Sequence, residues 1–317
     1  MITQQFFLHE GREDVSLTTY VLSDSRELLD GRLRPGILIC PGGGYLNCSD
    51  REAEPIALRF AAMGYHAFVL RYSVYMDQGE PYPVGKSMQK RARSLFPNSM
   101  QDIGLAFLKL REHASEWKLD TQRIALCGFS AGAHNSAMYA TRYQGKDIAG
   151  YFQQDAEIFK PAACILAYGL YDYCLLMENP ALIRDPFAKE LRKAAAIALL
   201  GSDKPSQQLL EQVSPARQVS AHTPPLFLWA TGEDSLVPVS QTAAFTLALS
   251  KAGIPFEAHV FESGPHGLSL ADQATAGSRF ELNPVAAQWL PLAQTWLEKR
   301  LALPLREIPL WMEQLER

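Results

Sequence analysis

The chain has 317 residues, of which 47% are hydrophobic and 20% charged; these ordinary globular values exclude disordered, collagen-like and coiled-coil classes. The formal net charge of −4 argues against a nucleic-acid or anionic-membrane partner. No apolar run is long enough to span a membrane and no secretory signal is visible, so we expect a soluble, cytoplasmic protein. The five cysteines form no CxxC pair and the seven histidines are scattered, so we expect neither a metal nor a cofactor.

Short apolar runs bounded by glycine or proline alternate with longer stretches of helical spacing. An antiparallel edge strand is expected within the first 22 residues, in VSLTTYVL. Further strands are predicted at 37–40, 66–71, 124–128, 164–168, 226–230 and 257–261. Helices are predicted from near residues 52–54 to 63, with Pro55 in the first turn, and at 98–117 and 284–301.

This alternation of strands and helices predicts an α/β fold, a mostly parallel sheet with helices on both faces. We expect one domain over residues 1–302, with cap-like insertions at 74–97 and 174–223 and a C-terminal tail at 303–317. The basic run at 90–93 is interpreted as a solvated face rather than a binding site. The apolar tail segment favours a homo-oligomer, and docking on its own domain is the alternative.

The most specific motif is Gly128-Phe129-Ser130-Ala131-Gly132, which follows the apolar run IALC and precedes a helix-compatible stretch. In that context G-x-S-x-G predicts a nucleophile elbow, a strained strand-to-helix turn that exposes the serine hydroxyl above the sheet. The pentapeptide arises by chance fairly often, so the flanking strand and helix carry the inference. Ser130 is therefore the candidate nucleophile.

A serine hydroxyl needs a general base, and the base needs an acid to orient it. In this architecture the order along the chain is Ser, acid, His, each after a strand. Asp234 follows the predicted strand 226–230, and His266 follows the predicted strand 257–261. We therefore predict Asp234 as the acid, in preference to Glu233 and Asp172, and His266 as the base.

Backbone amides are also needed to bind the oxyanion of an acyl-transfer intermediate. The run PGGGY at 41–45 follows an early strand, so we predict that Gly43 and Gly44 donate, together with the amide of Ala131. A phosphate cradle is the weaker reading of these glycines because no GK[ST] follows. Tyr45 is a candidate for substrate binding. His134 lies one helical turn after the serine and is more simply a helix histidine packed on the sheet.

With these motifs placed, the chain resembles the α/β-hydrolases, and more narrowly the acetylxylan-esterase-like carboxylesterases related to the hormone-sensitive-lipase group. The resemblance lies in CPGGGYLNCSDREAEPIALRFAAMGYHAFVLRYSV, in CGFSAGAH and in TPPLFLWATGEDSLVPVSQ through to ESGPHGLSLA. It implies an α/β-hydrolase fold with a sheet of about eight strands. It also implies an esterase triad that acts on short acyl groups of sugars or other alcohols.

The expected function is thus hydrolysis of short-chain, acetyl-type esters of small molecules, including acetylated sugars, through an acyl-enzyme. A peptidase-like serine hydrolase of the same fold is one alternative. A non-catalytic ligand-binding module that keeps the hydrolase pocket is the other.

Overall fold

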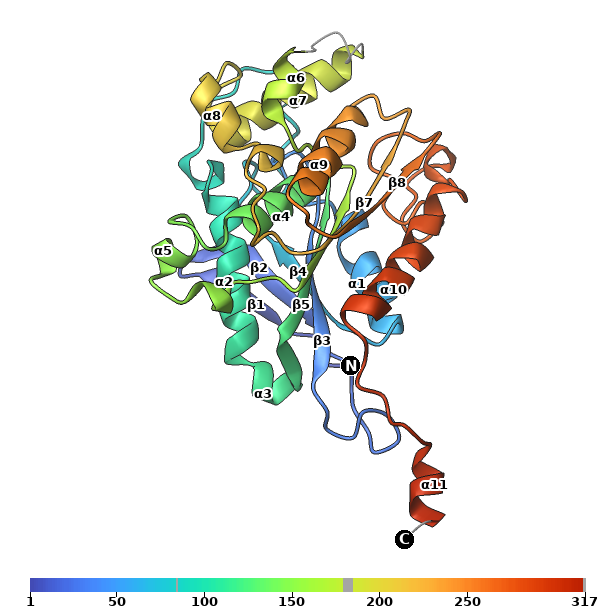
Figure 1. Ribbon diagram of the computed structural model, residues 1–317. Helices are drawn as coiled ribbons and strands as arrows, with labels where there is room; N and C mark the ends of the chain where they lie inside the picture. Colours follow the sequence, from blue (N-terminus) through green and yellow to red (C-terminus); the bar gives the residue numbers. More distant parts are fainter. Residues whose placement is uncertain (84, 179–184, 316–317) are drawn as a thin grey trace.

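A computed structural model describes residues 1–83, 85–178 and 185–315. One sheet of eight strands runs through the molecule in the order β1-β2-β4-β3-β5-β6-β7-β8 (Figure 1). The strands are β1 (Gln5–His9), β2 (Arg12–Tyr20), β3 (Arg34–Cys40), β4 (His66–Arg71), β5 (Leu119–Phe129), β6 (Ala163–Ala167), β7 (Leu226–Thr231) and β8 (Phe256–Phe261). From β4 to β8 all neighbours are parallel, which confirms the prediction of a mostly parallel sheet of about eight strands.

The antiparallel part of the sheet differs from the sequence-based expectation in one respect. The segment expected as the edge strand forms β2, which pairs with β1 on one side and β4 on the other. The edge on this side of the sheet is β1, a strand that apolar patterning did not predict. Residues of β1 are exposed or half-buried, and its apolar run, Phe6 to Leu8, is only three residues long.

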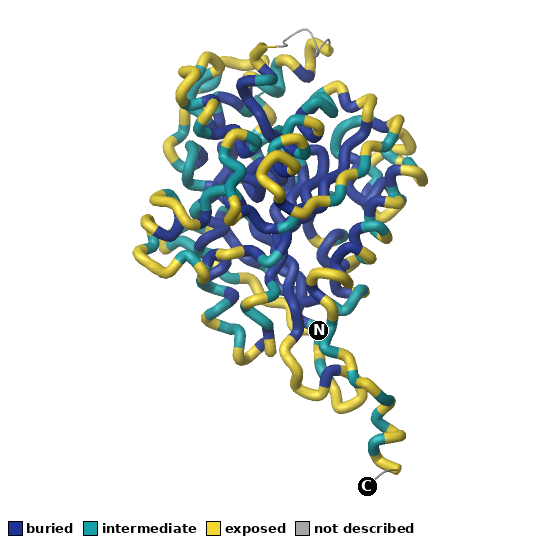
Figure 2. Tube along the Cα trace, in the orientation of Figure 1, coloured by how far each residue is buried: buried dark blue, intermediate teal, exposed yellow. Residues whose placement is uncertain are grey.

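Helices cover both faces of the sheet (Figure 1). They are α1 (Glu54–Ala62), α2 (Asn98–Glu112), α3 (Ala114–Trp117), α4 (Ala131–Arg142), α5 (Ala149–Phe152), α6 (Tyr173–Glu178), α7 (Pro186–Leu200), α8 (Gln207–Gln212), α9 (Ser240–Lys251), α10 (Trp289–Arg300) and α11 (Leu310–Leu315). The apolar sides of α1 and α10 share one core cluster with one face of the sheet. Those of α2, α4 and α9 share another with the opposite face. The sheet is therefore the buried middle layer (Figure 2).

Three predicted helices have boundaries that the structure refines. α1 begins at Glu54 with Pro55 in its first turn, as predicted, because a proline there loses no intrahelical bond. The stretch at 98–117 is divided into α2 and α3, with His113 between them. The stretch at 284–301 is helical from Trp289, after a short 3-10 turn at Ala286–Gln288.

The basic run at 90–93 is only partly a solvated face. Arg91 donates to both carboxylate oxygens of Glu80 at 2.7 Å, and its guanidinium lies 4.4 Å from the ring centroid of Tyr75. Arg93 donates to Asp77 at 2.5 Å. Arg91 and Arg93 thus form ion pairs with acidic residues of the same connection, 74–97. The run of basic residues alone does not reveal these pairs.

The connection 174–223 carries α7 and α8, which lie beside α6 at one end of the molecule, while α11 lies at the other end (Figure 1). Residues 84, 179–184 and 316–317 of the predicted insertions and tail fall outside the described residues. Across the described ranges, no helix is both long enough and apolar enough to cross a membrane.

Candidate active site

Ser130 lies in the turn between β5 and α4, at a backbone conformation that few residues adopt (φ 50°, ψ −115°). Its amide donates to the carbonyl of Ala167 on β6 at 2.9 Å, which ties the turn to the sheet. A Cβ on Gly132 would collide with the carbonyl oxygens of Cys40 and Pro41, and one on Gly128 would collide with Gly132. Only glycine therefore allows this close approach of helix to sheet.

Side chains from three loops form a hydrogen-bonded chain at this turn. Ser130 Oγ donates to His266 Nε2 at 2.8 Å, and His266 Nδ1 donates to Asp234 Oδ2 at 2.6 Å. Asp234 follows β7 and His266 follows β8, so both side chains come from the carboxyl ends of parallel strands. The structure thus brings the three predicted residues together.

Asp234 is held by its own loop as well as by the histidine. Its Oδ1 accepts hydrogen bonds from the amides of Leu236 at 2.9 Å and Val237 at 2.8 Å, and its side chain is fully buried. The two carboxylates weighed against it have other partners. Glu233 accepts from the amide of Gly264, and Asp172 pairs with Arg217. In the structure as described, neither carboxylate forms a hydrogen bond or an ion pair with His266.

The surroundings of His266 favour its protonated form. Burial alone would lower the pKa of the imidazole, but the charge of Asp234, the hydrogen bond to it and the charge of Glu52 outweigh burial. The pKa of His266 is therefore raised above its ordinary value. A histidine in this setting readily accepts a proton from a neighbouring hydroxyl.

The predicted amide donors lie around the same hydroxyl. Gly43, Gly44 and Ala131 line one cavity together with Ser130 and His266. Ala131 is the first residue of α4, where amides lack an intrahelical acceptor. Among the described residues, the amides of Gly43 and Gly44 have no hydrogen-bond acceptor. All three remain available to a bound oxygen.

Tyr45 and His134 form a buried pair beneath the cavity. His134 Nε2 donates to the carbonyl of Val213 at 2.8 Å, so its Nδ1 accepts from the Tyr45 hydroxyl at 2.6 Å. Burial lowers the pKa of His134 to about 4, which keeps the ring neutral. Both residues line the cavity. His134 therefore lies at the site as well as in the helix, where it positions Tyr45.

Sequence reasoning did not assign Glu52 to the site. Its Oε2 accepts from the amide of Gly42 at 2.7 Å, in the glycine loop, and its Oε1 accepts from the Tyr168 hydroxyl at 2.7 Å. Burial raises the pKa of Glu52, although both hydrogen bonds oppose that shift. The Tyr168 ring lies edge-on to His266, with 5.1 Å between centroids. Glu52 thus connects the glycine loop to the histidine.

The cavity at Ser130 has a volume of about 540 Å³. Tyr82, from the connection 74–97, lies on its wall. Leu191, Arg192 and Ala195 of α7, from the connection 174–223, lie on it too. Both long connections therefore contribute to the site, as their length predicted. Individual lining residues such as Arg192 belong to no recognisable sequence motif, so only the packing of α7 identifies them as part of the cavity wall.

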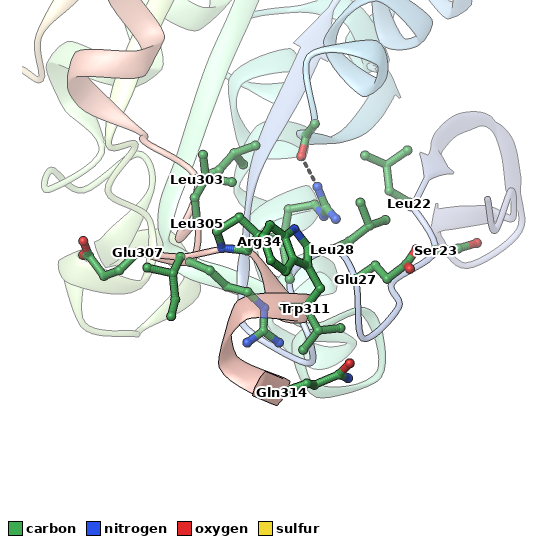
Figure 3. Close-up of a pocket in the computed structure, with 16 residues that line it drawn as sticks. Leu22, Ser23, Glu27, Leu28, Arg34, Leu303, Leu305, Glu307, Trp311 and Gln314 are labelled. Carbon is green, nitrogen blue, oxygen red and sulfur yellow. Dashed lines mark hydrogen bonds between the residues drawn. The ribbon is translucent and has the colours of Figure 1, made fainter. Parts of the chain in front are cut away.

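A larger cavity, of about 860 Å³, lies at the opposite end of the molecule. Figure 3 shows Leu303, Leu305 and Trp311 of the tail facing Leu28, with Arg34 hydrogen-bonded to Gly64. Ser130, Asp234 and His266 do not line this cavity. In the described part of the chain, no cluster of three or more His, Cys, Asp or Glu residues could hold a metal ion.

The sheet order, the elbow and the placement of the site after β5, β7 and β8 define an α/β-hydrolase. Residues 86–249 match the BD-FAE family, and the chain belongs to that family.

Two curated relatives show the similarity in sequence. The chain is 31% identical, over 75% of its length, to an endo-1,4-beta-xylanase B of Butyrivibrio fibrisolvens, of which it covers 33%. It is 26% identical, over 82% of its length, to the esterase LipQ of Mycobacterium tuberculosis, of which it covers 56%. The chain thus spans only about a third to a half of these relatives.

Solved structures match over almost their whole length. The carboxylesterase Cest-2923 of Lactobacillus plantarum has a TM-score of 0.77 and 28% identity, and the match covers 96% of this chain and 100% of that one. An α/β-hydrolase from a deep-sea metagenome, MGS-M1, has a TM-score of 0.70 and 32% identity, and the match covers 96% of this chain and 99% of that one. An acetyl ester-xyloside bifunctional hydrolase of Caldicellulosiruptor lactoaceticus has a TM-score of 0.70 and 28% identity, and the match covers 93% of this chain and 96% of that one.

Proposed function

We propose that the protein is a serine carboxylesterase with Ser130 as nucleophile, His266 as general base and Asp234 as the acid that orients the base. The observation that carries this proposal is the hydrogen-bonded chain of 2.8 Å and 2.6 Å that joins the three residues. Such a chain raises the reactivity of the hydroxyl, and the cavity gives an ester access to it.

In the proposed mechanism, Ser130 Oγ attacks the ester carbonyl carbon while His266 Nε2 takes the hydroxyl proton. The amides of Gly43, Gly44 and Ala131 donate to the oxyanion that forms. The carbon–oxygen bond to the alcohol then breaks, and the alcohol leaves with the proton from His266. Water, deprotonated by His266, attacks the acyl-enzyme and releases the carboxylic acid and the free serine.

We propose short acyl groups, acetyl above all, as the acyl part, and small alcohols that include sugars as the other part. The modest cavity volume supports small substrates. The names of two similar proteins, one an acetyl ester-xyloside hydrolase and one a xylanase, support a sugar. Rates on p-nitrophenyl acetate, longer p-nitrophenyl esters, acetylated xylosides and amino-acyl amides test this. Faster cleavage of amides than of acetates would favour a peptidase instead.

Labelling with a fluorophosphonate tests the nucleophile directly, because such probes react only with an activated serine. We expect the wild-type protein to be labelled and the Ser130→Ala variant to remain unlabelled. Ser136→Ala is a matched control on α4, since Ser136 is buried away from the cavity lining. An unlabelled wild-type protein would instead support a non-catalytic ligand-binding module.

We further propose that the protein forms a homo-oligomer through its tail and resides in the cytoplasm. The support is that Trp311 and Leu315 of α11 are 58% and 77% exposed, so this short helix presents large apolar side chains that a second copy of the chain would cover.

A further inference from the structure

Arg192 lies on the wall of the cavity that contains Ser130. It belongs to α7, and it also lines an adjoining cavity of about 430 Å³, which shares Leu170, Tyr173 and Ala195 with the first. Its guanidinium is therefore placed at the boundary between the reaction cavity and an adjoining space of similar size.

Among the described residues, Arg192 has no hydrogen-bond or ion-pair partner, and the only titratable group that it approaches is the neutral Tyr173 phenol. Its Nε is buried without a hydrogen bond, and no described carboxylate forms an ion pair with it. Residues 179–184, which precede α7, have the sequence NPALIR and contain no carboxylate. Arg51, the other arginine that lines the cavity, pairs with Glu281 at 3.0 Å.

The carboxylates of the cavity are engaged elsewhere. Asp50 pairs with Arg71, and Glu52 accepts from Gly42 and Tyr168. Of the residues that α7 contributes to this cavity, Leu191, Arg192 and Ala195, only Arg192 is charged. The other charged residues of the helix, Lys189, Glu190 and Lys193, line the adjoining cavity but not this one, together with Asp203. The α7 wall of this cavity thus carries one positive charge, and no carboxylate in the described ranges of the chain forms an ion pair with it.

A partly buried cation without a counter-ion, one of whose N–H groups is buried without an acceptor, is energetically unfavourable. Burial lowers the pKa of Arg192 to about 10, so the group is still charged at neutral pH. The planar guanidinium offers paired N–H donors that match a carboxylate in a bidentate geometry. A ligand that brought a carboxylate to this wall would supply both the missing charge and the missing acceptors.

We propose that the substrates of the Ser130 site are esters that carry a carboxylate, which Arg192 binds. This inference rests on the proposed esterase function and narrows it from short-chain esters in general to acidic ones. Arg192 is a specificity-determining residue in this scheme: it holds the carboxylate, while the ester carbonyl reaches Ser130.

Matched pairs of esters test the proposal. On the alcohol side we would compare 3- and 4-acetoxybenzoate with 3- and 4-acetoxybenzamide, in which an amide of the same shape replaces the carboxylate. On the acyl side we would compare mono-p-nitrophenyl adipate with its primary amide. The readout is the ratio of kcat/KM for the acidic ester to that for the amide, so intrinsic differences between the esters cancel between variants.

In Arg192→Met we expect this ratio to fall at least tenfold in one of the pairs, mainly through KM, because a bidentate charged contact is lost. Arg192→Lys, which keeps the charge but not the planar group, should give an intermediate ratio. Lys193→Met is the matched control, since Lys193 is the next residue of α7 but does not line the Ser130 cavity, and it should leave both rates unchanged. An unchanged ratio in every pair would overturn the proposal.

A measurement on the wild-type protein protects the test against a misfolded variant. 4-Hydroxybenzoate, a product of the acidic ester, should inhibit hydrolysis of p-nitrophenyl acetate at least tenfold more strongly than 4-hydroxybenzamide does. Equal inhibition by the two compounds would contradict the proposal. A wild-type protein that hydrolyses no ester and takes no fluorophosphonate label would refute the esterase function itself, which is a different outcome.

Discussion

At the residue scale, the site depends on how each buried polar atom finds its partner. Asp234 accepts two backbone amides with Oδ1 and the histidine with Oδ2, so both oxygens are used. This arrangement fixes which nitrogen of His266 carries the proton, and leaves Nε2 free to accept from Ser130.

Replacing Asp234 with asparagine should abolish most of the activity. The amide group would either oppose the backbone amides with its own N–H or favour the wrong tautomer of His266. We expect kcat to fall by about 10⁴-fold, with the fold retained. Steady-state kinetics with p-nitrophenyl acetate checks this, and circular dichroism checks the fold. Glu233→Gln serves as control and should stay within about threefold of wild type; an Asp234→Asn variant of similar activity would contradict the assignment.

The pH dependence follows from the raised pKa of His266. The base works when neutral, so kcat/KM should rise with pH through this pKa and reach half its plateau above the ordinary value of about 6.5. Removing the charge of Asp234 should move the midpoint of the residual activity to lower pH. A pH–rate profile of both proteins measures this. A wild-type midpoint below about 6.5 would contradict the prediction.

The same shift predicts the sign of a stability effect. Because the folded-state pKa of His266 is raised, its contribution to stability is fully present below the unfolded-state pKa and is lost as pH rises through the folded-state value. In His266→Gln that dependence should disappear. Denaturant unfolding between about pH 5 and 9 compares the two proteins; identical slopes would contradict the prediction.

Glu52 should matter to both stability and activity, because it anchors Gly42 and Tyr168 at once. Glu52→Ala leaves the amide and the hydroxyl without their buried acceptor, and we expect a loss of about 2–4 kcal/mol of unfolding free energy. We also expect kcat to fall more than KM changes, because the glycine loop loses its anchor. Glu52→Gln, which can still accept from Gly42, should lose less. Equal loss in both variants would contradict this explanation.

At the element scale, the elbow is a contact between one helix and the loop after one strand. A methyl group at Gly132 would meet backbone carbonyls of Cys40 and Pro41, which cannot move without shifting β3. We expect Gly132→Ala to cost about 2–4 kcal/mol of stability or to prevent folding. Gly150→Ala in α5 is the control, since its Cβ would meet nothing closer than 3.6 Å. Thermal unfolding measures both, and equal effects would contradict the steric argument.

Also at the element scale, the interior strands were predictable because each is a short apolar run next to a glycine or proline. β4 matches its expected range of 66–71, and β7 begins where it was expected. The edge strand β1 was missed because its apolar run, Phe6 to Leu8, is only three residues long, shorter than the runs that mark strands. The break at His113 was missed because apolar spacing continues through it to Trp117.

At the scale of the whole molecule, the tail and the two long connections distinguish the chain from a minimal sheet domain. The single domain at 1–302 stays a prediction. We expect light scattering to give a mass that is a multiple of 35.3 kDa for the full chain and a single chain's mass after removal of residues 304–317. Replacing Trp311 and Leu315 by serine should have the same effect as truncation. Equal monomeric masses for all three proteins would defeat the proposal.

Local patterns in the sequence were enough to predict the class of fold and to propose the type of chemistry. Alternating apolar runs predict the parallel sheet, and a G-x-S-x-G motif after a strand indicates an activated serine, since both signals are local in the chain. Tertiary structure decided which side chains surround that serine. Glu52, Tyr168 and Arg192 carry no motif, and they reach the site only because loops far apart in the chain meet at the carboxyl ends of the strands. Burial and unpaired charge arise from that meeting, so they cannot be read from neighbours in the chain.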